Sequence, residues 1–289
     1  MLWFILSLAS AIFKSIEDLF NKKSLERVDE FLVTWGFRAF ALLFSLPLLF
    51  FITIPDIDSQ FWYALIISGG LNTFVFILYI KAIRTSPLSV TVPMLAFSPL
   101  FLLLTSPLIL GEFPNLYGLI GIFLIVFGAY LLHIKEKSKG LLAPFRALIK
   151  EKGPTLMLAV AFFWSITANI DKIGINHSSP IFWMITLNMF LFITLSIVVL
   201  IKKKERIKSQ FFQNIKTLLP AGLFSAFTQF SMWTAVTMTI VPYVISIKRM
   251  SVVFSSLFGF FIFKERFLKT RLLGVLIMVL GVLFITLLK

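Results

Sequence analysis

The sequence predicts an all-α integral membrane protein with ten transmembrane helices, arranged as two inverted five-helix repeats. Three observations predict this fold: an apolar composition, ten apolar segments of spanning length, and an internal similarity between the two halves. Of the 289 residues, 59% are hydrophobic and 14% are charged, whereas soluble domains contain about 25% charged residues. So little polar surface could not cover a water-soluble core of this size.

Ten segments are long and apolar enough to cross a bilayer, which requires about 20 mostly apolar residues. Short polar connections with turn signals separate most of them. The first segment has neither a basic leading region nor a small-residue cleavage site, so we expect it to be retained as a helix. The predicted helices cover residues 2–21, 31–52, 61–81, 87–110, 114–134, 154–174, 180–201, 218–238, 241–263 and 270–288.

Two local patterns describe the later helices of each half. Four prolines in the fourth predicted helix, Pro87, Pro93, Pro99 and Pro107, remove backbone hydrogen bonds and predict a bend. Glycines seven residues apart in 119–132 and in 272–285 would place small residues on one helix face. We expect this face to serve close helix packing.

The two halves of the chain resemble each other at a nearly constant offset. A shift of 150 residues lays 8–23 on 158–173 and pairs Arg38 with Asn188. With three extra residues in the second half, a shift of 153 pairs Ala82 with Ala235, Ser98 with Ser251, Phe101 with Phe254, Glu112 with Glu265, Gly121 with Gly274, and Gly128 with Gly281. The pattern indicates duplication, with a first repeat at 1–134, a basic linker at 135–153 and a second repeat at 154–289. Because each repeat has an odd number of spans, the two must be inserted in opposite orientations.

The residues at 82–132 and 235–288 end each half in the same way. A helix is followed by a Gly-Glu or Lys-Glu pair and then by a final helix with spaced glycines. In this arrangement the chain resembles the EamA family of the drug/metabolite transporter superfamily over essentially its whole length. The resemblance implies a ten-helix secondary transporter of small metabolites with a central cavity, and it names no substrate. The family usually has a tryptophan in the first helix where this chain has Lys14, while the second half keeps Trp164.

The basic residues report the orientation in the membrane. The net charge is 27 minus 13, or +14. Of the 27 basic residues, 21 lie in the loops after the first, third, fifth, seventh and ninth predicted helices, and only Lys172 and Lys289 lie on the opposite face. Basic loops stay in the cytoplasm, so both termini of this multi-pass cell-membrane protein are predicted outside. Members of the family commonly have cytoplasmic termini, but the 21-to-2 bias is the stronger evidence.

Several classes of function lack their sequence signals. The chain has no Cys and only two His, which argues against thiol chemistry and a His-based metal site, and no cofactor is expected. The basic excess reports topology, so no nucleic-acid partner is expected. An integral membrane enzyme or lipid-handling protein is the alternative function, although HExxH, GxSxG and Walker motifs are absent. A non-transporting scaffold would not need buried charges.

The expected partners are a small-molecule substrate and the lipid bilayer. A coupling proton and a homodimer are left open.

Charged residues inside the predicted helices are the first candidates for a substrate site, because each costs about 2.5 to 3.5 kcal/mol on insertion. Lys14, Glu17 and Asp18 lie on one polar stripe of the first helix, at spacings that allow ion pairs within the helix. Trp164 and Asp171 lie on the equivalent stripe of the sixth helix. The alternative is that the acidic residues, near helix ends, only reach interfacial water.

Three further basic residues fall inside predicted helices: Arg38 in the second, and Lys248 and Arg249 in the ninth. Adjacent helical residues point about 100° apart, so Lys248 and Arg249 cannot face one cavity equally. One of the two could pair with Glu17 or Asp18 as a structural salt bridge, or Arg249 could bind an anionic or zwitterionic substrate. Polar and aromatic surface is added by Asn72, Gln229 and Trp233, for which helix-to-helix bonds or core packing are equally expected. Glu112 and Glu265 are expected to cap helices or to lie in the interface.

Overall fold

The computed structural model describes residues 1–25, 29–86, 91–133, 151–201, 211–263 and 269–287. These residues form helices and no strand. The predicted linker 135–153 lies almost wholly outside them, as does Glu265. Four helical spans among the described residues are long and apolar enough to cross a membrane: Phe31–Phe51, Ser59–Ala82, Lys152–Asn176 and Pro180–Ile201. They coincide closely with four of the predicted segments, and shorter apolar helices accompany them.

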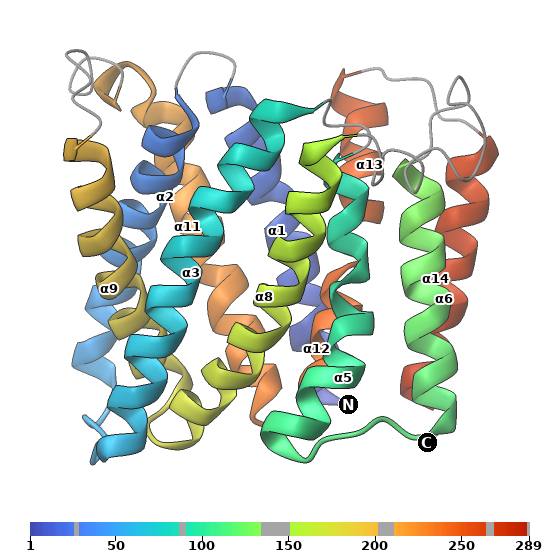
Figure 1. Cartoon of the computed structure of the whole chain (residues 1–289), viewed down its shortest axis with the longest axis horizontal. Helices are drawn as coiled ribbons and strands as arrows, with labels where there is room; N and C mark the ends of the chain where they lie inside the picture. Colours follow the sequence, from blue (N-terminus) through green and yellow to red (C-terminus); the bar gives the residue numbers. More distant parts are fainter. Residues whose placement is uncertain (26–28, 87–90, 134–150, 202–210, 264–268, 288–289) are drawn as a thin grey trace.

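The helices stand side by side in one bundle (Figure 1). The first half contains α1 (Leu2–Leu25), α2 (Glu30–Ser45), the 3₁₀ helix η1 (Leu46–Phe51), α3 (Ser59–Thr85), the 3₁₀ helix η2 (Val92–Phe97), α5 (Ser98–Leu110) and α6 (Leu116–His133). The second half contains α8 (Lys152–Asn176), α9 (Pro180–Ile201), α11 (Ile215–Val236), α12 (Val241–Lys248), α13 (Ser251–Phe263) and α14 (Lys269–Leu287).

The surface of the bundle is apolar, as the composition predicts. Large hydrophobic side chains on several helices are exposed, including Leu104 at 63%, Phe123 at 55%, Ile193 at 48% and Leu276 at 54%. An exposed apolar surface spread over many helices is costly in water and favourable against lipid tails. The described residues therefore form an all-helical membrane protein.

The fourth and the ninth predicted spans are interrupted in the structure, and the second span also changes from α-helix to the 3₁₀ helix η1 near its end. The span predicted at 87–110 begins, in its described part, with the 3₁₀ helix η2, and α5 starts at Ser98 with a proline in its first turn. The span predicted at 241–263 is divided, because α12 ends at Lys248 and α13 begins at Ser251. Between them the backbone makes tight bonds of the 3₁₀ type, from Arg249 N to Ser246 O (3.1 Å) and from Met250 N to Ile247 O (2.9 Å). The sequence predicted the bend before α5 from its prolines and missed the break after Lys248.

Both interruptions end at positions that the sequence offset of 153 residues pairs. Ser98 and Ser251, which the offset of 153 residues pairs, are the first residues of α5 and α13. The first interruption has prolines to explain it, since proline donates no backbone hydrogen bond. In the second half Pro242 lies in the first turn of α12, where it is tolerated, and it does not explain the break.

The glycines of α6 and α14 bring the two helices into backbone contact. A Cβ atom added at Gly121 would lie 2.6 Å from Gly281 O, and one added at Gly128 would lie 2.6 Å from Gly274 O. Because the residue numbers rise in one helix and fall in the other, the two helices are antiparallel. The packing role expected for these glycines is confirmed.

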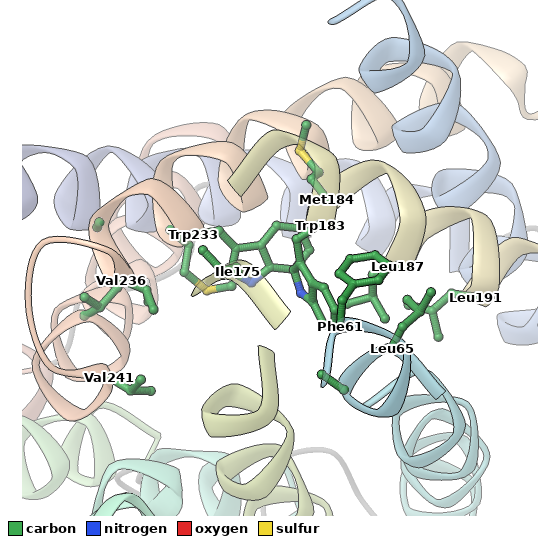
Figure 2. Close-up of a cluster of buried hydrophobic side chains, with 14 of the residues drawn as sticks. Phe61, Leu65, Ile175, Trp183, Met184, Leu187, Leu191, Trp233, Val236 and Val241 are labelled. Atoms are coloured by element: carbon green, nitrogen blue, oxygen red, sulfur yellow. The ribbon is translucent and has the colours of Figure 1, made fainter. Parts of the chain in front are cut away.

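The buried core lies between α3, α8, α9 and α11. Phe61 and Trp183, both fully buried, pack edge to face with their ring centroids 5.8 Å apart. Ile175 of α8 and Trp233 of α11 join the same cluster (Figure 2). Elsewhere, α1 packs mainly on α11, and α3 packs mainly on α8. The start of α1 and the end of α14 lie at the same end of the bundle, the lower end in Figure 1.

Replacing Gly121 with alanine should destabilise the protein, because the new methyl group would meet a backbone carbonyl that cannot rotate away. Overpacking of this kind costs about 1 to 3 kcal/mol. We expect the thermal unfolding midpoint of the detergent-solubilised Gly121→Ala protein to fall by several degrees. The matched control is Gly70→Ala in α3, where an added Cβ meets nothing within 4 Å and the midpoint should not fall. Equal midpoints for the two variants would contradict the close contact of α6 and α14.

Candidate functional site

The polar stripe of α1 is held together by ion pairs. Lys14 Nζ lies 2.7 Å from Glu17 Oε1 and 2.9 Å from Asp18 Oδ1, so one ammonium group serves two carboxylates. Glu17 is almost fully buried, at 3% exposure, whereas 46% of the Asp18 side chain is accessible. The spacing of three and four residues on one helix turn produces this geometry, as the sequence predicts. In this stripe the buried carboxylate of Glu17 is paired with Lys14, and the carboxylate of Asp18 is paired with Lys14 but remains partly accessible.

All seven charged residues predicted for the site come close enough for their charges to interact. Lys248 interacts with Lys14, Glu17, Arg38 and Arg249. Asp171 interacts with Lys248 and Arg38, and Arg249 interacts with Asp18. These residues belong to α1, α2, α8 and the α12–α13 junction, which come from both halves of the chain. We call them the charged cluster: Lys14, Glu17, Asp18, Arg38, Asp171, Lys248 and Arg249.

Arg38 joins the cluster to a chain of amide groups. Its Nη1 donates to Asn188 Oδ1 (3.2 Å), and Asn188 Nδ2 donates to Gln229 Oε1 (2.7 Å). The guanidinium carbon also lies 5.1 Å from the centre of the Phe76 ring, within range of a cation–π interaction. Arg38 and Asn188 are the two residues that the 150-residue offset pairs, so equivalent positions of the two halves touch. Gln229 is buried and takes part in the helix-to-helix bonding expected as its alternative role.

The break between α12 and α13 directs Lys248 and Arg249 to different neighbours. Lys248 Nζ donates to the thioether Sδ of Met232 on α11, at 3.0 Å. Arg249 donates through Nε to Ser98 Oγ (3.1 Å), and its Nη2 donates to the same hydroxyl. Arg249 therefore connects the two helix interruptions of the fold. Neither residue forms an ion pair with a described residue.

The third carboxylate is held by neutral groups on α3. Ser68 Oγ donates to Asp171 Oδ1, and Asn72 Nδ2 donates to Ser68 O (3.0 Å) and Ser68 Oγ (3.2 Å). Asp171 is 8% exposed, so it lies inside the bundle. Asn72 thus supports Asp171 through Ser68.

The two tryptophans predicted for the site differ in their surroundings. Trp164 is half-buried and lies 6.0 Å from Tyr79 between ring centroids, near the Phe76 ring that faces Arg38. Trp233 is 4% exposed and belongs to the buried core, with no partner for its ring N–H among the described residues. Trp164 therefore lies beside the charged cluster, and Trp233 serves core packing, its alternative role.

A second set of charged contacts lies at the end of the bundle where α1 begins. Lys172 forms an ion pair with Glu112 and donates to Thr239 O (2.8 Å), while Val241 N donates to Glu112 Oε2 (2.9 Å). Glu112 thus caps the start of α12, and the capping role expected for it is confirmed. Asp58, directly before α3, accepts from Phe61 N through Oδ1 (3.0 Å), and its Oδ2 lies 2.8 Å from His177 Nδ1, which directly follows α8. These contacts, the backbone N–H first, lower the pKa of Asp58.

Several residues of the site were missed in the sequence. Ser98 and Met232 contact the two adjacent cations, Ser68 holds Asp171, and Tyr79 lies within electrostatic range of the charged side chains of the α1 stripe. Ser98 had a signal, because the 153-residue offset in the sequence pairs it with Ser251. Serine, methionine and tyrosine are common in apolar helices, and only packing reveals the neighbours of the other three. The residues that the structure describes contain no group of three or more His, Asp or Glu placed to hold a metal ion.

An apolar helical bundle that brings charged side chains together in its interior is typical of a membrane transporter, and the comparisons agree. The family model described as the EamA-like transporter family matches residues 1–134 and 151–287. The chain therefore belongs to the EamA-like transporter family. It is 24% identical to an uncharacterized transporter of Archaeoglobus fulgidus over 296 residues, covering 99% of each protein. A solved crystal structure superposes with a TM-score of 0.78 over 99% of this chain and 96% of the other, at 15% identity, which shows the fold alone.

Removing the ammonium group of Lys14 should destabilise the protein, because Glu17 and Asp18 would lose their common partner. Breaking a fully buried pair costs about 3 to 5 kcal/mol, and the accessibility of Asp18 reduces this to about 1 to 3 kcal/mol. We expect a lower thermal midpoint for Lys14→Met in detergent. The control is the neutral triple variant Lys14→Met, Glu17→Gln and Asp18→Asn, whose midpoint should recover. If the triple variant were the less stable of the two, the ion pairs would not be the reason.

Proposed function

We propose that this transporter moves a small polar metabolite, amino-acid-like or anionic, across the cell membrane by alternating access. The charged cluster is the proposed substrate site, with Asn72, Trp164 and Gln229 as its polar and aromatic surroundings. The carrying observation is the meeting of seven charged side chains from both halves of an apolar bundle. Charges inside a membrane protein are costly, and they commonly mark substrate and ion pathways.

The proposed mechanism rests on an inverted repeat of two five-helix units, 1–134 and 154–289, joined by the basic linker 135–153. Several contacts support this symmetry. The packing of α1 on α11 has its counterpart in the packing of α8 on α3. The pairs Gly121–Gly281 and Gly128–Gly274 are exchanged by the 153-residue offset. In such a fold the two units rock around a shared central site, which matches the position of the cluster between them.

Coupling to a proton is the proposed driving reaction. Asp18 is the carboxylate best suited to exchange a proton, because its side chain is 46% accessible while Glu17 and Asp171 are buried. Its contact with Lys14 connects that exchange to the rest of the cluster. The alternative function, a membrane enzyme or lipid-handling protein, gains no supporting observation in the described residues and remains an outcome of the test.

Transport is tested with purified protein reconstituted into liposomes and offered labelled alanine, succinate, phosphate and glucose. We expect uptake of at least one solute by the wild type, and at least about a tenfold lower rate in the triple variant Lys14→Ala, Glu17→Ala and Arg249→Ala, because charged contacts of about 1.5 to 3 kcal/mol are lost. The control, Lys81→Met, removes an exposed charge of α3. Both variants are first checked for a monodisperse folded population. Unchanged uptake in the triple variant would contradict the site. Turnover of a lipid without passage of any solute would favour the alternative function.

Both chain termini are proposed to lie outside the cell. Because the chain has no Cys, a single introduced cysteine reports its own side without further changes. The connection between α5 and α6, which contains Phe113 (58% exposed), lies at the same end of the bundle as the start of α1, and the last turn of α1, which contains the exposed Lys23, lies at the opposite end (Figure 1). We expect a membrane-impermeant maleimide to label Phe113→Cys in intact cells and Lys23→Cys only after permeabilisation. The reverse pattern would place the termini in the cytoplasm.

A further inference from the structure

Three of the four basic residues in the charged cluster, Arg38, Lys248 and Arg249, form hydrogen bonds only with neutral groups among the described residues. Lys248 donates to a thioether, Arg249 to a hydroxyl and Arg38 to an amide oxygen. Arg38 Nε is buried and has no partner within the described part of the chain. A thioether sulfur is a weak acceptor, so the ammonium group of Lys248 is poorly satisfied. Buried charges of this kind normally have a counter-charge or several strong hydrogen bonds.

The carboxylates of the cluster do not supply that counter-charge by contact. Glu17 and Asp18 are bound to Lys14, and Asp171 is bound to Ser68. Lys14 is thus the one cation of the cluster that forms ion pairs with described residues. Four cations and three carboxylates give the cluster a formal charge of 4 minus 3, or +1. The excess lies on the side of Arg38, Lys248 and Arg249.

The backbone at the helix break does not compensate the excess either. Carbonyl oxygens at the end of a helix attract cations, but those at the end of α12 are already used. Arg249 N lies within bonding distance of the oxygens of Ile245 and Ser246, and Met250 N donates to Ile247 O. The side chains of Lys248 and Arg249 instead extend to α11 and α5. Their charge is therefore available to a bound molecule.

We infer that the charged cluster binds an anion carrying a carboxylate or phosphate group, held by Lys248 and Arg249 with Arg38 as a third cation. The inference rests on the proposed transport function and names the substrate class of the same site. All three side chains are half-buried, so part of each remains accessible. A guanidinium presents two parallel N–H donors that fit an oxyanion, and such charged hydrogen bonds are stronger than neutral ones.

Ser98 holds Arg249 ready for the anion. Arg249 Nε and Nη2 both donate to the single oxygen of the Ser98 hydroxyl. A carboxylate or phosphate could accept from the same two groups with two separate oxygens. Ser98 begins α5 in the first half, and Arg249 lies between α12 and α13 in the second half. An anion bound to Arg249 would therefore lie where these two helix interruptions meet. A zwitterion or a cation is disfavoured, because each α1 carboxylate already has Lys14 as a partner.

The binding test measures the thermal midpoint of purified protein in sodium succinate and in sodium phosphate, each against sodium chloride at equal ionic strength. A ligand that binds the folded state raises its stability with concentration. We expect a saturable rise with one or both anions in the wild type. In Lys248→Met the apparent affinity should fall about 10- to 100-fold, the factor that a lost charged hydrogen bond produces. The control Lys81→Met, which removes an exposed charge outside the cluster, should bind as the wild type does.

Uptake by liposomes separates this inference from the proposed function. Uptake of succinate or phosphate that Lys248→Met reduces and Lys81→Met does not would support both. Uptake of glucose, alanine or putrescine with neither anion raising the midpoint would overturn the anion site and leave the transport function standing. Saturable stabilisation by an anion that never crosses the membrane would support the site and contradict transport. An equal response of Lys248→Met and the wild type to the anions would overturn the assignment of Lys248. If no solute enters and no anion stabilises the protein, both are wrong.

Discussion

The ion pairing of Lys14 with Glu17 and Asp18 is the constraint on which the centre of the structure depends. A lysine near the middle of an apolar helix is costly in a membrane, and two carboxylates one turn away offset that cost within a single helix. The pairing leaves α1 with two acidic groups and one basic group. Cations from α2 and the α12–α13 junction can then approach it without an excessive build-up of positive charge. Without Lys14, two carboxylates would repel each other inside the bundle.

The two helix interruptions place side chains that continuous helices would direct elsewhere. In a straight helix Lys248 and Arg249 would simply point about 100° apart. The tight turns at Arg249 and Met250 end α12 beside the charged cluster. From this position Lys248 reaches Met232 on α11, and Arg249 reaches Ser98 on α5. The corresponding change from η2 to α5 brings Ser98 to Arg249. Irregular backbone within a membrane is tolerated where the protein surrounds it, and here it occurs in both halves at paired positions.

The contacts at the periphery have a different role from those at the centre. The glycines of α6 and α14 bring two backbones together and keep the helices at the edge of the bundle in fixed antiparallel register. At the end of the bundle where α1 begins, the two halves are joined by the ion pair between Lys172 and Glu112 and by the bond from Val241 N to Glu112. An ion pair there must break if the halves separate on that side. The centre, by contrast, is held by Arg38, Asn188 and Gln229 through neutral amide groups.

The sequence by itself determined the membrane environment, most helix boundaries, the glycine packing and the identity of the charged residues in the cluster. Composition and helical periodicity act locally, so the 59% apolar content and the spacing of Lys14, Glu17 and Asp18 were sufficient. Only the tertiary structure decided which partners those residues have. The approach of Lys248 to Met232, of Asp171 to Ser68, and of Arg249 to Ser98 joins residues far apart in the chain. Such contacts follow from helix packing and from a backbone break that no proline marks, and neither has a local signal.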